Sequence, residues 1–382
     1  MGVIEPPARI GMLGGGQLGR YALMAARTMG YATTVLDPDP AAPAGRVADT
    51  HLVAAYDTPE ALEVMAATCA VVTTEFENPP AAALQRLATA VPVHPNPATV
   101  AIAQDRIVEK RFLHQHGVAT APFAVVESAA DLAAAAGHVG GPGLLKTARL
   151  GYDGKGQRPV DGIDGIDELA AAWSALGEVP CVLERRVRLD QELSVLVARR
   201  ASGAVAVYPV AENHHVDGIL DLTVVPARVA PTLAAEASEL SHDIATALDY
   251  VGLLAVELFV SDGHLLVNEL APRPHNSGHW TLDAATTSQF EQQVRAVCGL
   301  PLGDPALTAP AVAMVNLLGD RWHDGEPAWA AALADPGAHL HLYGKTAARP
   351  GRKMGHLTVT AATPAAAAAA AIAARDAART QR

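Results

Sequence analysis

The first hundred residues alternate between apolar strand-like segments and helical ones, and this alternation limits the possible folds more than any other feature. Apolar segments at 8–16, 31–40 and 69–80 each end in glycines, acids or prolines. The segment 17–30 between the first two has helical periodicity and ends in glycine. Strands that alternate with helices form a parallel sheet with helices on its faces. We therefore predict an α/β unit with a doubly wound parallel sheet over residues 1–105.

Two further regions follow a proline-rich boundary at 91–100. Residues 106–190 open with an amphipathic helix that ends at Gly117, and continue with short strands, helices and a glycine loop. From 191 onward strand patterns dominate, and the alanine-rich stretch near 365–374 favours a helix because alanine has the highest helix propensity. We expect a small α+β domain at 106–190 and a larger mixed-sheet domain at 191–382.

Charge and cysteine content exclude several classes of function. The net charge is −12, which argues against a nucleic-acid or anionic-membrane partner. The three cysteines lie far apart without metal-ligand spacing, as expected for reduced thiols in the cytoplasm. The N-terminus lacks a signal-peptide pattern, and no run of about 20 strongly apolar residues indicates a membrane span.

The glycines Gly14, Gly16 and Gly19 form a G-x-G-x-x-G loop between the first predicted strand and helix. Such a loop lets backbone N–H groups approach an anion, and Asp37 lies near the position of a dinucleotide ribose partner. The pattern is compatible with an NAD-dependent dehydrogenase. It is equally compatible with a tight turn that binds nothing.

A second glycine loop follows a lysine on a predicted strand. Lys146 precedes Gly151, Gly154 and Gly156, and Lys155 lies inside the loop. A flexible loop of this kind can cover phosphates with its N–H groups, although it lacks the Walker A pattern. The alternative is a surface hairpin with ordinary turn glycines.

Two carboxylates interrupt neighbouring apolar strands. Glu257 lies within one strand, Glu269 ends the next, and a hairpin turn at 261–264 separates them. Buried carboxylates require compensation, and a bridging divalent metal is the natural one. Side chains alternate along a strand, so an even separation of twelve puts both acids on one face only if the hairpin contains a bulge or a three-residue loop. We expect one of these irregularities.

The segment NELAPRPHNSGHW, residues 268–280, gathers polar and ionisable side chains directly after the second acidic strand. Together with GGGQLGR (14–20), GYDGKGQ (151–157) and RPGRKMGHL (349–357), it resembles the 5-(carboxyamino)imidazole ribonucleotide synthetases of the ATP-grasp superfamily. The resemblance extends from about residue 9 to residue 360 and implies an ATP-grasp fold.

The resemblance also implies a reaction and its site. ATP phosphorylates bicarbonate to carboxyphosphate, and 5-aminoimidazole ribonucleotide is then carboxylated on its exocyclic amine. The cofactor metal is Mg²⁺, with Mn²⁺ as an alternative, and the enzyme is a homodimer. The implied ATP-binding residues are Arg106, Lys146, the loop Gly151, Tyr152, Asp153, Gly154, Lys155, Gly156 and Gln157, the stretch Glu184, Arg185, Arg186 and Val187, and Glu192, His215, Asn268 and Glu269.

The second substrate and the reacting groups are assigned in the same way. The implied substrate-binding residues are Gln17, Leu18, Glu75, Tyr152, Arg273, His275, Asn276, Ser277, Lys345, Arg352 and Lys353; the catalytic ones are Arg273, His275, Lys353 and Asp153; and the metal ligands are Glu257 and Glu269. Asp153 is a candidate proton acceptor or a turn residue. Ala271 stands where many ATP-grasp enzymes have an asparagine ligand, and His215 is preferred to His214 by motif spacing alone.

Two other functions are compatible with parts of the sequence. A formate-dependent glycinamide ribonucleotide transformylase shares the fold, but it predicts Asp-Thr in place of Asn276-Ser277 and Glu in place of Gln17. An NAD-dependent dehydrogenase accounts for the first glycine loop, but it leaves Lys146, Glu257 and Glu269 unexplained.

Overall fold

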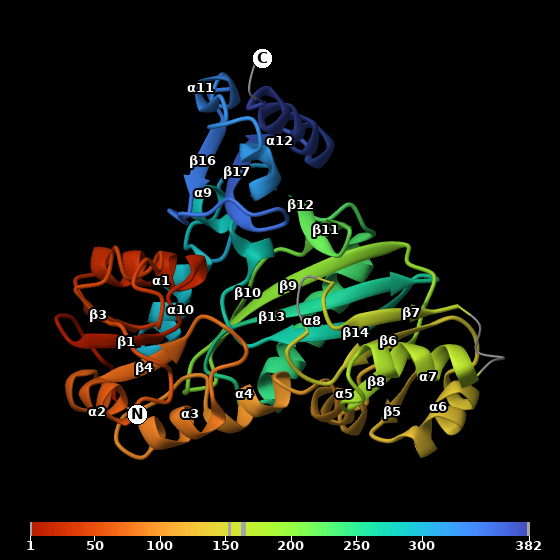
Figure 1. The fold of residues 1–382 in the computed structure, drawn as a ribbon. Helices are drawn as coiled ribbons and strands as arrows, with labels where there is room; N and C mark the ends of the chain where they lie inside the picture. The colour runs from red at the N-terminus through yellow and green to blue at the C-terminus, as the bar shows by residue number, and fades with distance from the viewer. Residues whose placement is uncertain (1, 152–153, 162–165, 380–382) are drawn as a thin grey trace.

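A computed structural model describes residues 2–151, 154–161 and 166–379 of the chain. The described residues form two four-stranded sheets and one nine-stranded sheet. Figure 1 shows the N-terminal elements in red and orange at one side of the large sheet, and the small sheet with α6 and α7 at the other. The large sheet therefore lies between the two smaller units.

The N-terminal unit is a parallel sheet covered by helices, as the alternating pattern predicts. Its strands pair in the order β3-β2-β1-β4, and every pairing is parallel. Strand β1 is buried along most of its length, which explains its apolar sequence. The elements are β1 (Arg9–Leu13), α1 (Gln17–Thr28), β2 (Ala32–Leu36), β3 (Thr50–Leu52), α2 (Pro59–Thr68), β4 (Val71–Thr74), α3 (Ala81–Ala88) and α4 (Pro97–Ala103).

The small unit begins with a helix whose start is capped by a side chain. Asp105 accepts hydrogen bonds from the N–H groups of Ile107 and Val108, so α5 begins at Arg106. The strands that follow form an antiparallel sheet in the order β5-β8-β6-β7. The elements are α5 (Arg106–Gln115), β5 (Phe123–Val126), α6 (Leu132–Val139), β6 (Gly143–Thr147), β7 (Gln157–Val160), α7 (Ile166–Ala175) and β8 (Cys181–Arg185).

The large sheet has the order β14-β13-β9-β11-β12-β15-β17-β16, with β10 paired to β9. Its strands pair antiparallel, and one parallel bridge joins Thr120 to Val267. The elements are β9 (Gln191–Arg199), β10 (Val205–Val207), β11 (Ala211–Val216), β12 (Ile219–Val225), α8 (Pro231–Ala247), β13 (Gly252–Ser261), β14 (His264–Ala271), α9 (Thr281–Ala284), α10 (Gln289–Val297), β15 (Ala311–Leu318), α11 (Trp329–Ala332), β16 (Ala338–Leu342), β17 (Lys353–Ala361) and α12 (Pro364–Ala377).

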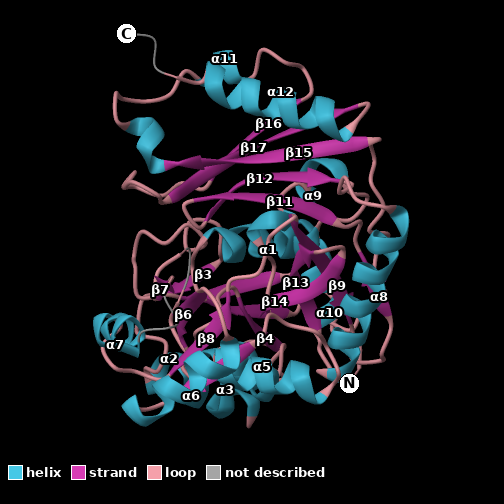
Figure 2. Ribbon diagram, turned by 90° about the vertical axis from the view of Figure 1, so that its right-hand side faces the viewer, coloured by secondary structure: helices cyan, strands magenta, loops and turns pink. Residues whose placement is uncertain are grey.

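Helices on the large sheet tie the molecule together. The alanine-rich tail forms α12, which lies over the part of the sheet with β15 and β17 (Figure 2) and packs its small side chains against them. Helix α10 packs against α1 of the N-terminal unit through Phe290, Leu18 and Tyr21. Since α10 also packs against β13 and β9, it joins the N-terminal unit to this part of the large sheet. Within the described ranges, no helix combines the length and apolarity that a membrane crossing requires.

Candidate active site

The two acids of the β13–β14 hairpin lie directly opposite each other. The turn is a two-residue turn at Asp262 and Gly263, so the three-residue loop is wrong. The expected bulge is present, because Glu257 pairs with Glu269 while Leu258 pairs with Val267. The extra residue breaks the alternation of faces, and the acids that an even spacing would separate come together.

Each acid is paired with a cationic or hydrogen-bonding side chain. The Glu269 carboxylate lies 2.9 Å from the Arg106 guanidinium, and the Glu257 carboxylate lies 3.0 Å from Nε2 of His275. Burial alone would raise the pKa of Glu257, but the hydrogen bond from His275 and the positive charge nearby, that of Arg273 included, outweigh it and lower that pKa to about 2. Glu257 is therefore a carboxylate at neutral pH, as a metal ligand must be.

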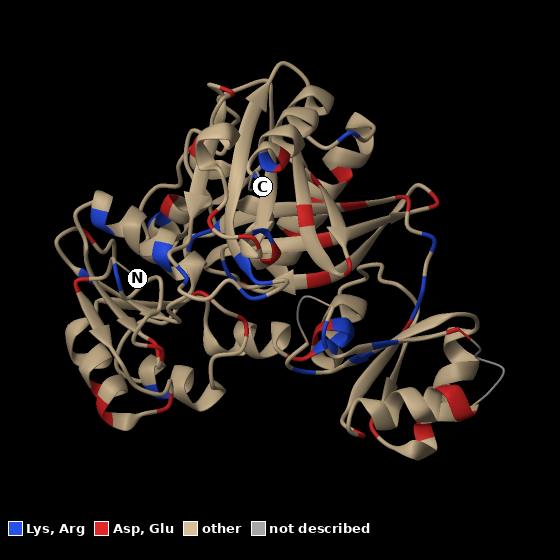
Figure 3. Ribbon diagram, turned by 45° about the horizontal axis from the view of Figure 1, so that its top comes forward, with Lys and Arg blue, Asp and Glu red and all other residues tan. Residues whose placement is uncertain are grey.

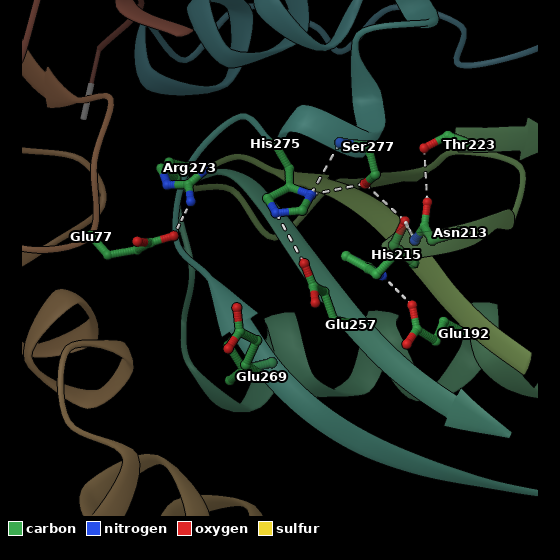
Figure 4. A network of polar contacts seen from close by, with 12 residues as sticks. Glu77, Glu192, Asn213, His215, Thr223, Glu257, Glu269, Arg273, His275 and Ser277 are labelled. Atoms are coloured by element: carbon green, nitrogen blue, oxygen red, sulfur yellow. Dashed lines mark hydrogen bonds and ion pairs between the residues drawn. The ribbon is translucent and has the colours of Figure 1, made fainter. Parts of the chain in front are cut away.

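Figure 4 shows how the neighbouring side chains converge on these acids. His275 lies between Glu257 and Ser277, and Arg273 reaches an ion pair with Glu77 of the N-terminal unit. The structure brings together Glu257, Glu269, Arg273 and His275, which lie on two strands and the loop after them. Glu77 was missed by the sequence reasoning, because nothing near it in the chain indicates the ion pair.

His215 and Glu192 form a further ion pair, on strands β11 and β9 of the large sheet. Nδ1 of His215 contacts the Glu192 carboxylate across strands β11 and β9. Burial would lower the pKa of His215, but Glu192 raises it through a hydrogen bond and its charge. His214, the neighbour that was not chosen, is exposed.

A buried charge cluster surrounds Lys146. Its Nζ lies 2.8 Å from Glu184, and Lys110 lies 3.4 Å from the other oxygen of the same carboxylate. Burial would raise the pKa of Glu184, but the two lysines lower it to about 2. Lys110 was not predicted, although its place on the buried face of an amphipathic helix is a signal that could have found it. Its neighbour Glu109 accepts a hydrogen bond of 2.7 Å from the N–H of Leu270.

The residues after Glu184 turn away from this cluster. Arg185 donates to the carbonyl of Val139 at 2.7 Å, and Arg186 pairs with Asp161 at 2.8 Å. Val187 is half-buried in the connection to β9. The side chains of Arg185 and Arg186 therefore bond to the protein, and so do their backbone N–H groups, which donate to the carbonyls of Pro122 and Pro142.

The start of the second glycine loop lines a small polar cleft. Leu150 and Gly151 line this cleft together with Arg106, Glu109 and Glu269. Further along the loop, Gly154 and Lys155 are exposed, Gly156 and Gln157 are partly buried, and Gln157 begins β7. Two predicted residues, Tyr152 and Asp153, lie outside the described residues.

The first glycine loop is occupied by carboxylates of the protein itself. Glu75 accepts hydrogen bonds from the N–H groups of Gly16 and Gly19 at 2.7 and 2.9 Å, and Asp37 accepts one from Gly15 at 2.6 Å. A Cβ on Gly16 would lie 2.5 Å from Glu75, so glycine is needed for this close approach. Because these donors are already used, the dinucleotide interpretation of the loop is wrong.

Glu75 faces cations from the far end of the chain. Burial raises the pKa of its carboxyl, and the N–H groups of Gly19 and Gly16 with the charges of Arg273 and Lys345 oppose that rise. The side chain of Gln17 is partly exposed at the start of α1, whereas Leu18 is packed in the core. The residues of the first loop that were predicted to bind the second substrate thus lie at the boundary between the N-terminal unit and the large sheet.

The cations of the C-terminal loop lie at this boundary too. Nζ of Lys345 donates to the carbonyl of Lys353 at 2.7 Å, and Arg352 donates to the carbonyl of Ala347 at 2.9 Å. Figure 3 shows blue segments between the N-terminal unit and the large sheet, although acids outnumber bases in the chain. Cations are therefore concentrated locally, as a small anionic substrate requires.

The remaining polar residues of the 268–280 segment are deeply buried. Asn276 is 5% exposed, and its amide atoms have no hydrogen-bond partner among the described residues. His279 stacks on His356 at 4.5 Å, and His356 stacks on His341 at 4.5 Å. The sequence does not predict this histidine stack, because its two outer members, His279 and His341, are more than sixty residues apart in the chain. The Asn268 side-chain oxygen likewise has no partner in the part of the chain that is described.

Comparison with protein families matches three successive parts of the chain. Residues 8–104 match the ribonucleotide synthetase preATP-grasp domain, residues 111–290 the ATP-grasp domain, and residues 312–370 the phosphoribosylaminoimidazole carboxylase C-terminal domain. The N5-carboxyaminoimidazole ribonucleotide synthase of Brucella melitensis is 48% identical over 356 residues, which cover 93% of this chain and 97% of that one. The chain belongs to this family. Its members are ATP-grasp ligases of purine biosynthesis, as the motif resemblance predicts.

Other relatives and solved structures agree with this membership. The family member from Bacillus subtilis is 43% identical and covers 93% of this chain and 92% of its own length. The ADP complex of an N5-carboxyaminoimidazole ribonucleotide synthetase superposes with a TM-score of 0.91 at 40% identity, with 97% of each chain covered. The Aspergillus clavatus synthase in complex with ADP and 5-aminoimidazole ribonucleotide has a TM-score of 0.85 at 32% identity, covering 97% of this chain and 98% of that one. The transformylase and dehydrogenase alternatives are thereby excluded.

Proposed function

We propose that this enzyme uses ATP and bicarbonate to carboxylate the exocyclic amine of 5-aminoimidazole ribonucleotide, releasing ADP and phosphate. The observation that carries the proposal is the direct opposition of Glu257 and Glu269, with Arg106 on one acid and His275 on the other. Phosphoryl transfer depends mostly on positioning and charge neutralisation. In this arrangement Arg106 offers a positive charge to the phosphates, and the two carboxylates offer negative charges to a metal within the same site.

The nucleotide lies between the small unit and the large sheet. Arg106 and Lys146 contact its phosphates, and the loop from Gly151 to Gln157 covers them. The backbone of residues 184–187 contacts the adenine, because the Glu184 side chain is already bonded to Lys146 and Lys110. Glu192, His215 and Asn268 complete this site. The support is the placement of Arg106 and Gly151 in the same cleft as Glu269.

The acids fit a divalent metal of the hard, oxygen-binding kind. Glu257 and Glu269 offer carboxylates from adjacent strands, and the Asn268 oxygen between them in sequence is buried without a bond to any described residue. Glu257 and Glu269 would hold Mg²⁺, or Mn²⁺ in its place. When bound, this ion neutralises charge on the ATP phosphates.

The second substrate lies between the N-terminal unit and the C-terminal cations. Lys345 and Arg352 contact the phosphate of 5-aminoimidazole ribonucleotide, and the group Gln17, Leu18 and Glu75 contacts the rest of it, Leu18 by its backbone. Arg273, His275, Asn276, Ser277 and Lys353 surround bicarbonate. Support comes from the charges of Arg273 and Lys345, which act on the carboxyl of Glu75 and oppose the rise of its pKa on burial.

The reaction then needs two bond exchanges. A bicarbonate oxygen attacks the γ-phosphorus of ATP and displaces ADP, giving carboxyphosphate. The amine nitrogen forms a bond to the carboxyl carbon, phosphate leaves with the electron pair of the broken C–O bond, and the amine proton passes to a base. Asp153 is the base that we propose, and the covering loop excludes the water that would hydrolyse carboxyphosphate.

The deciding experiment measures ADP release by the purified enzyme with ATP and Mg²⁺. ADP should form when bicarbonate and 5-aminoimidazole ribonucleotide are both present, and replacement of the ribonucleotide by glycinamide ribonucleotide with formate should abolish it. Release that does not depend on bicarbonate would refute the proposal. We further propose that the enzyme is cytoplasmic and forms a homodimer. Light scattering coupled to size-exclusion chromatography tests the homodimer by its mass.

A further inference from the structure

A chain of buried hydrogen bonds leads from β12 through the large sheet to the ring of His275. Thr223 Oγ1 lies 2.9 Å from Asn213 Oδ1, Asn213 Nδ2 lies 2.9 Å from Ser194 Oγ, and Ser194 Oγ lies 2.9 Å from Ser277 Oγ. Ser277 Oγ in turn lies 2.8 Å from Nδ1 of His275. Figure 4 shows this chain ending at Glu257.

The direction of every bond in this chain follows from one backbone group. The N–H of Ser277 points at Nδ1 of His275 at 3.3 Å and can only donate, so Nδ1 must accept and carries no proton. The Ser277 hydroxyl must then donate to Nδ1 as well. It follows that the Ser194 hydroxyl donates to Ser277, which leaves the Ser194 lone pairs to accept from an amide N–H.

The orientation of the Asn213 amide is thereby determined. Its nitrogen faces Ser194, and its oxygen accepts from the Thr223 hydroxyl. At the other end, Nε2 of His275 carries the ring proton and donates to Glu257 at 3.0 Å. All donors run the same way along the chain, an arrangement in which successive hydrogen bonds polarise one another.

The surroundings leave these groups little freedom. Ser194, Thr223 and Ser277 are at most 1% exposed, and Asn213 is 7% exposed. Ser194 lies opposite Glu257 in the sheet, so the chain and the acid share one strand pairing. Gln289 binds the backbone of His275 from both sides, accepting from its N–H at 2.9 Å and donating to its carbonyl at 2.8 Å.

We propose that Ser194, Asn213 and Thr223 are positioning residues that keep the Ser277 hydroxyl a donor to Nδ1 and so reinforce, with the Ser277 N–H, the Nε2–H tautomer in which His275 donates to the proposed metal-ligand carboxylate of Glu257. The inference rests on the proposed function for the role of Glu257, but the tautomer itself does not. Groups that orient a metal ligand affect activity by about 10- to 100-fold when they are changed.

Asn213→Asp tests the direction of the chain with almost no change of shape. A carboxylate can only accept, so Ser194 would donate to it and Ser277 would donate to Ser194, which leaves Nδ1 of His275 with the 3.3 Å bond from the Ser277 N–H and without the 2.8 Å bond from the hydroxyl. A proton on Nδ1 would then find an acceptor in the Ser277 oxygen, so the chain and the N–H would favour opposite tautomers. In the full-length enzyme labelled with ¹⁵N-histidine, the wild-type Nδ1 should resonate as an unprotonated nitrogen and Nε2 as a protonated one. In the variant the Nδ1 signal should move towards the protonated position, with kcat lowered about tenfold and ATP affinity unchanged.

Ser194→Ala is the second variant, and it interrupts the chain without adding charge. It should give a mixture of the two His275 tautomers and a smaller loss of kcat. Ser241→Ala is the matched control, because Ser241 is also buried and donates to the carbonyl of Ala237 within its own helix, away from the chain to His275. His275→Asn assigns the signals.

The two proposals fail in different ways. A protonated Nδ1 in the wild type, or wild-type nitrogen signals in both chain variants, would overturn the positioning role whatever the enzyme catalyses. An altered tautomer with unchanged kcat would overturn it too. Wild-type enzyme that shows the expected signals but no bicarbonate-dependent ADP release would refute the proposed reaction and leave the tautomer assignment intact.

Discussion

Glu184 illustrates what a single buried charge requires of its neighbours. Its side chain is 4% exposed and compensates two ammonium groups, those of Lys110 and Lys146, of which the first is fully buried. Breaking a buried pair costs more than the pair contributes, because an uncompensated charge is left behind. This cluster connects α5 to the small sheet, beside the proposed nucleotide site.

Glu184→Gln should therefore destabilise the protein by about 3–5 kcal/mol in urea unfolding at pH 7. The folded-state pKa of Glu184 is about 2 against an ordinary value of 4.5. Because the folded pKa is lowered, its stabilisation is fully present above pH 4.5 and is lost as pH falls through 2. The difference between wild type and variant should shrink over that window.

The control for this prediction is Glu63→Gln, which removes an exposed ion pair with Arg86. It should change stability by less than about 1 kcal/mol. A pH-independent difference between wild type and Glu184→Gln would show that the carboxylate is not the stabilised form.

Glu269 belongs to the proposed metal site rather than to the stabilising clusters. Glu269→Gln should leave the circular dichroism spectrum unchanged and abolish ADP release, since a metal–phosphate contact in such a site is worth several kcal/mol. Near-normal turnover at saturating Mg²⁺ would remove Glu269 from the metal site. The same measurement on Glu63→Gln should give the wild-type rate.

At the scale of elements, the β13–β14 hairpin determines where the acids lie. The turn residues Asp262 and Gly263 both have positive φ, 49° and 80°, the conformation of a two-residue turn whose twist matches the strands. The bulge at Asn268 then changes the face of every residue beyond it relative to a regular ladder. Turn and bulge together place Glu269 against Glu257.

Gly263→Ala tests the turn alone. A Cβ there would meet nothing within 4 Å, so the whole cost is conformational, about 1 kcal/mol in urea unfolding. Gly137→Ala is the matched control, because that glycine also has open space around it but lies in helix α6 without positive φ. It should stabilise by up to about 1 kcal/mol. Equal effects of both substitutions would contradict the backbone argument.

At the scale of the whole molecule, the site is completed by segments from opposite ends of the chain. Glu77 of the N-terminal unit pairs with Arg273, and Gln293 of α10 donates to Thr73 at 2.8 Å. These contacts fix the N-terminal unit to helix α10 and to the segment that carries Arg273. The proposed sites for ATP and for the second substrate therefore use different cations.

Lys353→Met should separate the two sites. Removing this charge should cost about 2–4 kcal/mol of transition-state stabilisation, seen as loss of bicarbonate-dependent ADP release. ATP affinity, measured by calorimetry, should hardly change because Arg106 and Lys146 remain. Arg188→Met, at a cation whose side chain is 71% exposed, should leave both ATP affinity and ADP release unchanged. If ATP affinity falls with activity, Lys353 belongs to the nucleotide site.

The sequence alone determined the local elements and the chemical types in the site. The alternation over the first hundred residues, the strand acids at 257 and 269, and even the need for an irregular hairpin all follow from side-chain periodicity, which is a property of neighbours in the chain. The motif resemblance added the family, which the comparisons confirm.

The tertiary structure decided which charges meet. The pairing of Glu184 with Lys110, of Arg273 with Glu77, and of Glu75 with the first glycine loop joins residues 56 to 196 positions apart. The same holds for the hydrogen-bond chain to His275, whose direction depends on a single backbone N–H. Such contacts depend on how three sheets pack, and periodicity within one element contains no information about that packing.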